Sequence, residues 1–122
     1  MEQEEFEKLL MNKLLDGDNE IFIDLRNQYH QALVISREFT GCGFFTTFDV
    51  QGYTPKYLVT GRIDDVAAEF KNSNDMACFI LYIENGKIDT LEGFCFGDIW
   101  NSDYNEAKIV YCLPDQRRYE LT

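Results

Sequence analysis

Apolar residues recur at helical spacing near the start of the chain and alternate with polar residues after it. The spacing predicts a helix over 2–15, ended by an Asp-Gly pair, and a second helix over 20–31. Asp18 or Asn19 can cap the second helix, because a short polar side chain satisfies the free N–H groups of a first turn. The two apolar stripes consist of Phe6, Leu9, Leu10 and Leu14, and of Ile21, Leu25, Tyr29 and Ala32.

Alternation predicts strands along the rest of the chain. Segments 33–39 and 44–50 are expected to form two strands joined by a glycine-rich turn. A third strand is predicted over 57–63, and 66–70 is either its continuation or a short helical turn. The last strand is predicted over 108–113, where a proline stops it.

The strongest local pattern is a hairpin between residues 76 and 100. Asn85-Gly86 lies between two apolar runs, and both residue types tolerate the positive φ that a tight hairpin turn requires. A two-residue turn at this point fixes the pairing of the two strands and places Phe79 opposite Glu92. The hairpin is expected to lie at the centre of the sheet, because its faces are the most apolar in the chain.

Glu92 falls on the more apolar face of this hairpin and has two interpretations. Gly93 can form a bulge, or the residue can lie near a sheet edge, and either would turn the carboxylate outward. Alternatively Glu92 is a carboxylate in a partly apolar pocket, with Glu38 or Arg37 nearby as acid, base or ion partner.

These elements predict one α+β domain over residues 1–122, with two N-terminal helices packed on a mostly antiparallel sheet of about six strands. The second face of the sheet then needs cover or serves as a binding surface. Trp100 projects from a polar loop and is a candidate anchor for a partner, with Asp98, Asp103 and Glu106 around it.

Charge narrows the classes of partner. The formal net charge is −11, which argues against binding to nucleic acids or anionic membranes, since both need a basic surface. The same charge permits a basic protein partner, whose approach it would steer; alternatively, the chain is acidic simply for solubility. No apolar run is long enough to span a membrane, and the acidic N-terminus does not resemble a secretion signal.

The four cysteines lie in apolar, strand-like runs without CxxC spacing. We interpret them as buried thiols in a reducing compartment, which indicates a cytoplasmic protein. They are Cys42, Cys78, Cys95 and Cys112.

The sequence contains no recognisable catalytic or cofactor motif. His30 is the single histidine and is expected at a helix end, where a dipole or surface role is typical. The turn around Cys42 has two glycines but no following helix, which favours a plain hairpin over an anion site. No calcium-loop spacing is present. We therefore expect no metal and no cofactor, and the balance favours a protein that is not an enzyme.

Two segments, REFTGCGFFTTF (37–48) and FILYIENGKIDTLEGFCFGDIW (79–100), resemble a family of small bacterial proteins. Its members combine a GxGFFT turn with a GxIxxLEG hairpin and a tryptophan shortly after. The family has no established activity, so the resemblance implies no catalytic residues. Proline usually follows that tryptophan, whereas Asn101 does so here.

Three functional hypotheses follow. The first is a non-catalytic protein-interaction domain, including an acidic immunity-type protein that neutralises a partner protein. The second is a small-molecule-binding protein or enzyme that uses Glu92. The third is a purely structural domain, either of a larger assembly or of a homodimer formed through an exposed strand edge.

Overall fold

A computed structural model describes residues 1–97 and 99–122 and confirms the α+β class. The two helices come first in the chain, and seven strands and one short 3-10 helix follow. The elements are α1 (Gln3–Leu14), α2 (Glu20–Tyr29), β1 (Leu33–Phe39), β2 (Gly43–Asp49), β3 (Gly61–Phe70), β4 (Met76–Glu84), β5 (Lys87–Cys95), η1 (Tyr104–Glu106), β6 (Ala107–Tyr111) and β7 (Tyr119–Leu121).

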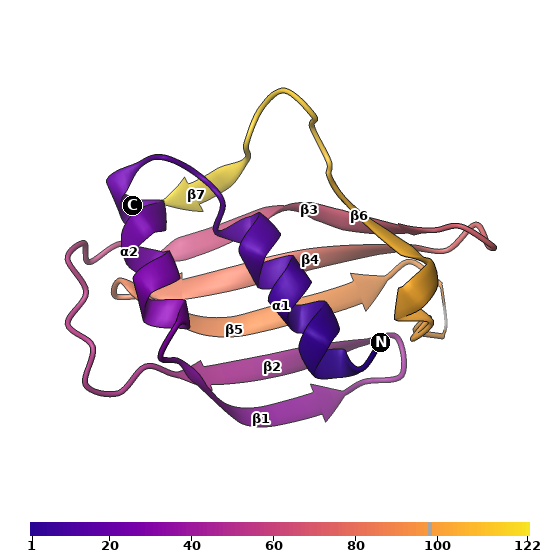
Figure 1. Cartoon of the computed structure of the whole chain (residues 1–122), viewed down its shortest axis with the longest axis horizontal. Coiled ribbons are helices and arrows are strands. Elements are labelled where there is room, and N and C mark those ends of the chain that lie inside the picture. The colour runs from indigo at the N-terminus through magenta and orange to yellow at the C-terminus, as the bar shows by residue number, and fades with distance from the viewer. Residues whose placement is uncertain (98) are drawn as a thin grey trace.

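One antiparallel sheet forms the body of the molecule, with strand order β1-β2-β5-β4-β3-β6 and with β7 also paired to β3. The predicted hairpin is β4 and β5, and it lies at the centre of the sheet as expected. Both helices cover the same face, and α1 crosses the middle of the sheet (Figure 1). The described residues place no helix on the opposite face, and β1 forms one free edge (Figure 1).

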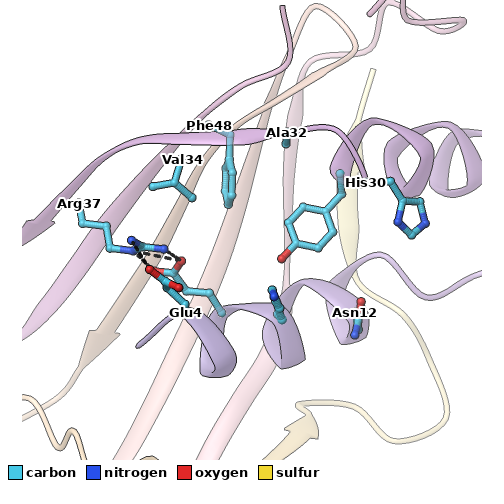
Figure 2. Close-up of a pocket in the computed structure, with 10 residues that line it drawn as sticks. Glu4, Asn12, His30, Ala32, Val34, Arg37 and Phe48 are labelled. Carbon is cyan, nitrogen blue, oxygen red and sulfur yellow. Dashed lines mark hydrogen bonds and ion pairs between the residues drawn. The ribbon is translucent and has the colours of Figure 1, made fainter. Parts of the chain in front are cut away.

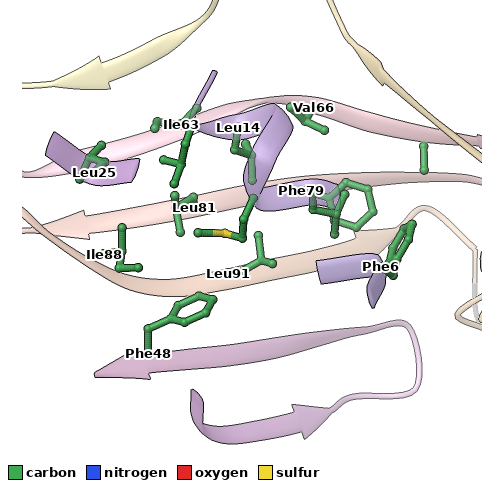
Figure 3. Packing of buried hydrophobic residues seen from close by; sticks show 14 of the residues in the cluster. Phe6, Leu14, Leu25, Phe48, Ile63, Val66, Phe79, Leu81, Ile88 and Leu91 are labelled. Atoms are coloured by element: carbon green, nitrogen blue, oxygen red, sulfur yellow. The ribbon is translucent and has the colours of Figure 1, made fainter. Parts of the chain in front are cut away.

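The core lies between the helices and the sheet (Figure 3). Phe6, Leu10 and Leu14 of α1 are almost completely buried, as their spacing predicts, whereas Leu9 is 45% exposed. The Phe6 ring stacks on Tyr104 at 4.0 Å between centroids and meets Phe79 edge-on at 5.7 Å. Truncation of one such buried side chain to alanine typically costs about 2–5 kcal/mol, so α1 is anchored firmly on the sheet.

The second helix begins where its cap was predicted. The side chain of Asn19 accepts a hydrogen bond from the backbone N–H of Phe22 at 2.9 Å. Neither helix in the described residues is long and apolar enough to cross a membrane.

The hairpin has the predicted turn but a different register. Asn85 and Gly86 both have positive φ, at 50° and 80°. Ile83 pairs with Ile88 but Tyr82 pairs with Thr90, so the residue between Ile88 and Thr90 is an extra one, a β-bulge.

The bulge overturns the predicted pairing of Phe79 with Glu92. Phe79 instead lies opposite Gly93, and Glu92 lies opposite Ile80 on the uncovered face. Side chains alternate between faces, so one extra residue moves every later side chain to the other face. Leu91 thereby enters the core, and Glu92 leaves it.

A helix residue explains why the bulge is stable. Gln28 is fully buried, its amide donates to the carbonyl of Gly86 at 2.5 Å, and its side-chain oxygen accepts from the N–H of Ile88 at 3.1 Å. The backbone groups at the hairpin end are therefore satisfied by a side chain, as buried polar groups require.

The third strand begins later than predicted and continues to Phe70, so the helical alternative for 66–70 is wrong. It contains a second bulge, between Ile63 and Val66. Asp65 at this bulge is completely buried and accepts hydrogen bonds from Arg117 at 2.7 and 3.2 Å. This ion pair holds the C-terminal tail against the sheet, where it forms β7, a strand that the polar tail sequence did not predict.

The prediction of buried cysteines is wrong for two of the four. Cys42 and Cys112 are exposed, because one lies in the β1–β2 turn and the other directly follows β6. Cys78 and Cys95 are half-buried, and all four thiols are free. Burial raises the pKa of the Cys78 thiol, which therefore stays protonated at neutral pH.

Candidate functional site

A cleft of about 590 Å³ lies between α1, the end of α2 and the first two strands. Figure 2 shows Val34 and Phe48 pointing from the sheet toward α1, with Arg37 and Glu4 at one end and His30 and Asn12 at the other. In Figure 1, α1 crosses the middle of the sheet and β1 lies at the edge to one side of it; residues of both elements line the cleft.

The sheet side of this cleft is apolar. Val34 of β1 and Phe48 of β2 pair across the two strands, and Ala32 precedes β1. The ring of Tyr29, from the last turn of α2, meets Phe48 edge-on with 6.1 Å between centroids. The cleft therefore offers an aliphatic and aromatic surface that suits an apolar side chain.

A charged network closes one end of the cleft. The guanidinium of Arg37 donates to the carboxylate of Glu7 from Nη2 at 2.8 Å and from Nε to both oxygens, at 3.0 and 3.3 Å. Thr46 and Gln3 also donate to this carboxylate, at 2.6 and 2.9 Å. Glu7 is only 2% exposed, so α1 is fixed to β1 and β2 by a fully hydrogen-bonded buried carboxylate.

The network sets the charge state of its neighbours. The hydrogen bonds that Arg37 donates to the Glu7 carboxylate raise the pKa of Arg37 above its usual value, so the guanidinium keeps its charge. Burial, and then the negative charge of Glu7, raise the pKa of the Tyr29 hydroxyl, and the positive charge of Arg37 offsets part of this. Tyr29 therefore presents a neutral hydroxyl to the cleft at neutral pH.

The outer side of the cleft is the free edge of the sheet. Four of the seven residues of β1 are large exposed hydrophobics: Leu33 is 67% exposed, Val34 40%, Ile35 61% and Phe39 60%. A free edge also leaves backbone N–H and C=O groups unpaired, which makes it a template for another strand. Exposed apolar side chains on such an edge are typical of an interaction surface.

The uncovered face of the sheet is acidic next to this edge. Glu38 of β1, Phe45 of β2 and Glu92 of β5 form one row across three adjacent strands. Asp49 lies on the same face at the other end of β2, opposite Leu33. The structure describes β1 and β2 completely. Their outward positions hold the carboxylates of Glu38 and Asp49 and no basic side chain.

The structure separates the predicted site residues into different surroundings. Arg37 lies in the cleft on the inner face, whereas Glu38 and Glu92 lie on the uncovered face. Glu92 is half-buried and accepts a hydrogen bond from the Tyr82 hydroxyl at 2.8 Å, and burial followed by this bond raises the pKa of Tyr82. Glu92 lines neither the cleft nor the smaller cavity near Trp100.

Trp100 is half-buried and is part of the packing at the end of the sheet. Its ring meets Phe44 and Phe79 edge-on at 5.5 and 6.1 Å, and its indole N–H donates to the Tyr104 hydroxyl at 3.0 Å. It also borders a cavity of about 330 Å³ beside the exposed side chains of Phe96 and Ile99. The predicted partner residue Asp98 lies outside the described residues.

Glu7 and Tyr29 line the cleft, but neither was predicted from the sequence as a site residue. Glu7 follows Gln3 by four positions and precedes Leu10 and Leu14 by three and seven, so the helical pattern places it on the buried face. This carboxylate within an apolar stripe is the signal that would have identified it. Tyr29 was placed in the apolar stripe of α2, and the pattern gave no reason to expect its hydroxyl in a cleft.

Metal-ligating side chains are dispersed in the described part of the chain. No three His, Cys, Asp or Glu side chains there are grouped closely enough to hold a metal ion. Comparisons with models of protein families, with curated proteins and with solved structures find no match to this chain.

Proposed function

We propose that the chain is a non-catalytic protein-interaction domain that binds a basic partner protein along the free edge of its sheet. The observation that carries this proposal is the concentration of exposed Leu33, Val34, Ile35 and Phe39 on one seven-residue edge strand, beside an open cleft. Soluble domains normally protect such an edge with charges, proline or covering elements, so an apolar edge favours a binding role.

The state of the buried carboxylates supports a role other than catalysis. Glu7 is held by Arg37 and Thr46, and Asp65 is held by Arg117. Asp24 accepts from the Tyr53 hydroxyl at 2.5 Å and from the backbone N–H of Lys56 at 3.0 Å. Each of these groups is engaged in joining segments of the fold, whereas a general acid or base needs access to a substrate.

The net charge supports the choice of partner. A chain of 122 residues with a formal charge of −11 attracts basic proteins and repels acidic ones. Electrostatic attraction mainly accelerates encounter and excludes wrong partners, whereas the apolar edge supplies the contact area.

An immunity-type role is the specific form of this proposal. In that role the basic partner is a toxic protein, and the bound complex is inactive. Small size and acidity support this form, and its direct test is growth. The partner expressed alone would arrest a host cell, and co-expression of this chain would restore growth.

Affinity capture tests the general proposal. The immobilised chain is exposed to a lysate of the source cell, beside two variants that carry the same substitution at exposed isoleucines. Ile35→Lys alters the edge strand, and Ile23→Lys alters α2, where the side chain is 42% exposed. We expect one basic protein to be retained by the wild type and by Ile23→Lys but not by Ile35→Lys. Retention of no specific protein would refute the proposal.

A further inference from the structure

Building on the proposed function, we infer that the partner contributes an extended segment that pairs with β1 as an additional strand. In this segment large apolar residues alternate with lysine or arginine. The apolar side chains face the cleft under α1, and the basic side chains face the acidic, uncovered side of the sheet.

The pairing site follows from the regular part of the edge strand. Val34 and Ser36 flank a bulge, whereas residues 36–39 pair with β2 without interruption. An added strand would continue this ladder at the usual spacing of about 4.8 Å between strands. Main-chain hydrogen bonds then supply affinity, and pockets for alternate side chains supply specificity.

An inward-facing charge on an edge strand usually prevents such pairing. Arg37 is the inward charge of β1, but its guanidinium is already bound to the carboxylate of Glu7. The ion pair is part of the fold, so an added strand meets a neutralised group instead of an isolated cation. The edge therefore remains open to a strand of suitable chemistry.

The cleft determines the inward-facing residues of the segment. Its sheet side consists of Val34, Phe48 and Ala32, and Tyr29 adds a ring with a neutral hydroxyl. The charged lining residues are Glu4, Glu7, Lys8 and Arg37, whose formal charges cancel. A neutral apolar side chain fits this surface, because it buries apolar area without an unpaired charge.

The uncovered face determines the outward-facing residues. Glu38 and Asp49 occupy the outward side of the first two strands, and Glu92 follows on β5. Opposite charges on neighbouring strands stabilise a pair, and like charges destabilise it. Lysine or arginine is therefore expected at each second position of the segment.

The same reasoning disfavours a second copy of this chain as the occupant. A copy of β1 would bring its own Glu38 to the acidic face and its own Arg37 to the neutral cleft. Two copies also repel each other through a charge of −11 each.

Synthetic peptides test the inferred chemistry. The probes are short peptides of alternating Val and Lys, of Val and Glu, and of Ser and Lys, with a Val/Lys peptide N-methylated at each second residue as the backbone control. Titration of the ¹⁵N-labelled chain at low salt gives both affinity and location. We expect the Val/Lys peptide to bind about tenfold more tightly than each of the other three, a difference of about 1.4 kcal/mol, with the largest amide shifts in residues 33–39.

A charge reversal provides the matched variant. Glu38→Lys removes the outward carboxylate of β1, and Glu69→Lys makes the same change on the same face, four strands away on β3. We expect Glu38→Lys to abolish the preference for Val/Lys over Val/Glu and Glu69→Lys to retain it.

Three results would overturn the inference. They are equal affinity for the Val/Lys and Val/Glu peptides, amide shifts centred away from β1, and a dimer in light scattering that Ile35→Lys dissociates. The last result would make the occupant a second copy. All three differ from failure of the proposed function itself, which is the absence of a retained partner protein in the capture experiment.

Discussion

Replacement of Arg37 by alanine tests whether the buried carboxylate of Glu7 depends on its ion pair. The substitution removes three charge-assisted hydrogen bonds, at 2.8, 3.0 and 3.3 Å, from the side chain of Glu7, which is 3% exposed. Loss of one partner from a fully buried ion pair costs about 3–5 kcal/mol. The side chain of Arg37 is 25% exposed, so water can replace part of the interaction, and Thr46 and Gln3 still donate. We therefore expect the free energy of unfolding to fall by about 2–3 kcal/mol.

Urea unfolding followed by the fluorescence of the single tryptophan measures this loss. Arg62→Ala is the control, because Arg62 is 49% exposed and its bond to Asp64 is 3.4 Å long. That change should cost less than about 1 kcal/mol, the usual range of a surface ion pair. Glu7→Gln in the Arg37→Ala background should recover stability, since it removes the unpaired charge. A loss below about 1 kcal/mol for Arg37→Ala would refute the reasoning, because the pair would then behave as a surface pair.

Three further predictions concern the packing of the core, the C-terminal tail and the hydrogen bond of Tyr53. Gly93→Ala would place a Cβ in steric conflict with the ring of Phe44 of β2 and should cost about 1–3 kcal/mol in urea unfolding. Gly97→Ala, which meets no atom within 4 Å, should cost less than about 0.5 kcal/mol. Arg117→Met leaves the carboxylate of Asp65, which is 0% exposed, without its cation. We expect the free energy of unfolding to fall by about 3 kcal/mol and the tail to be digested faster by a protease. An unchanged digestion rate would contradict this. The hydrogen bond to the carboxylate of Asp24 raises the pKa of Tyr53 from 10.0 to about 12. Between these pH values the folded chain holds a proton that the unfolded chain has lost, so the free energy of unfolding should fall as the pH rises through this range. The fall should be smaller in Tyr53→Phe, which has no hydroxyl to titrate.

Local patterns were sufficient to predict most of the fold. Helical spacing located both helices, the asparagine cap began α2, and Asn85-Gly86 formed the hairpin turn. These features depend on residues that are close in sequence, and sequence periodicity reports such short-range preferences well.

Features that depend on distant residues were not predictable in the same way. The hairpin bulge is satisfied by Gln28, about sixty residues earlier in the chain, and the tail strand depends on the bond between Asp65 and Arg117, fifty-two residues apart. A turn signal fixes register only as far as the ladder is regular, so a single bulge moved Glu92 to the other face.

The candidate site shows the same distinction between features set by neighbouring residues and features set by residues distant in sequence. Arg37 and Glu38 were predicted from the alternation of one strand, and both lie on β1, although on opposite faces. The partner of Arg37 is Glu7 on α1, thirty residues earlier, and the apolar surface of the cleft combines two strands and a helix end. Strand order decides which strand is an edge, and a hydrophobic pattern alone does not contain that order.

Amide hydrogen exchange of β1 in the complex with the captured partner tests the central claim most directly. In the free chain, the N–H groups of β1 that point away from β2 have no strand partner and should exchange rapidly with solvent. If the partner adds a strand to this edge, these N–H groups of residues 33–39 become protected when it binds. Unchanged exchange in β1, with protection instead at the β6 edge or around Trp100, would contradict the account.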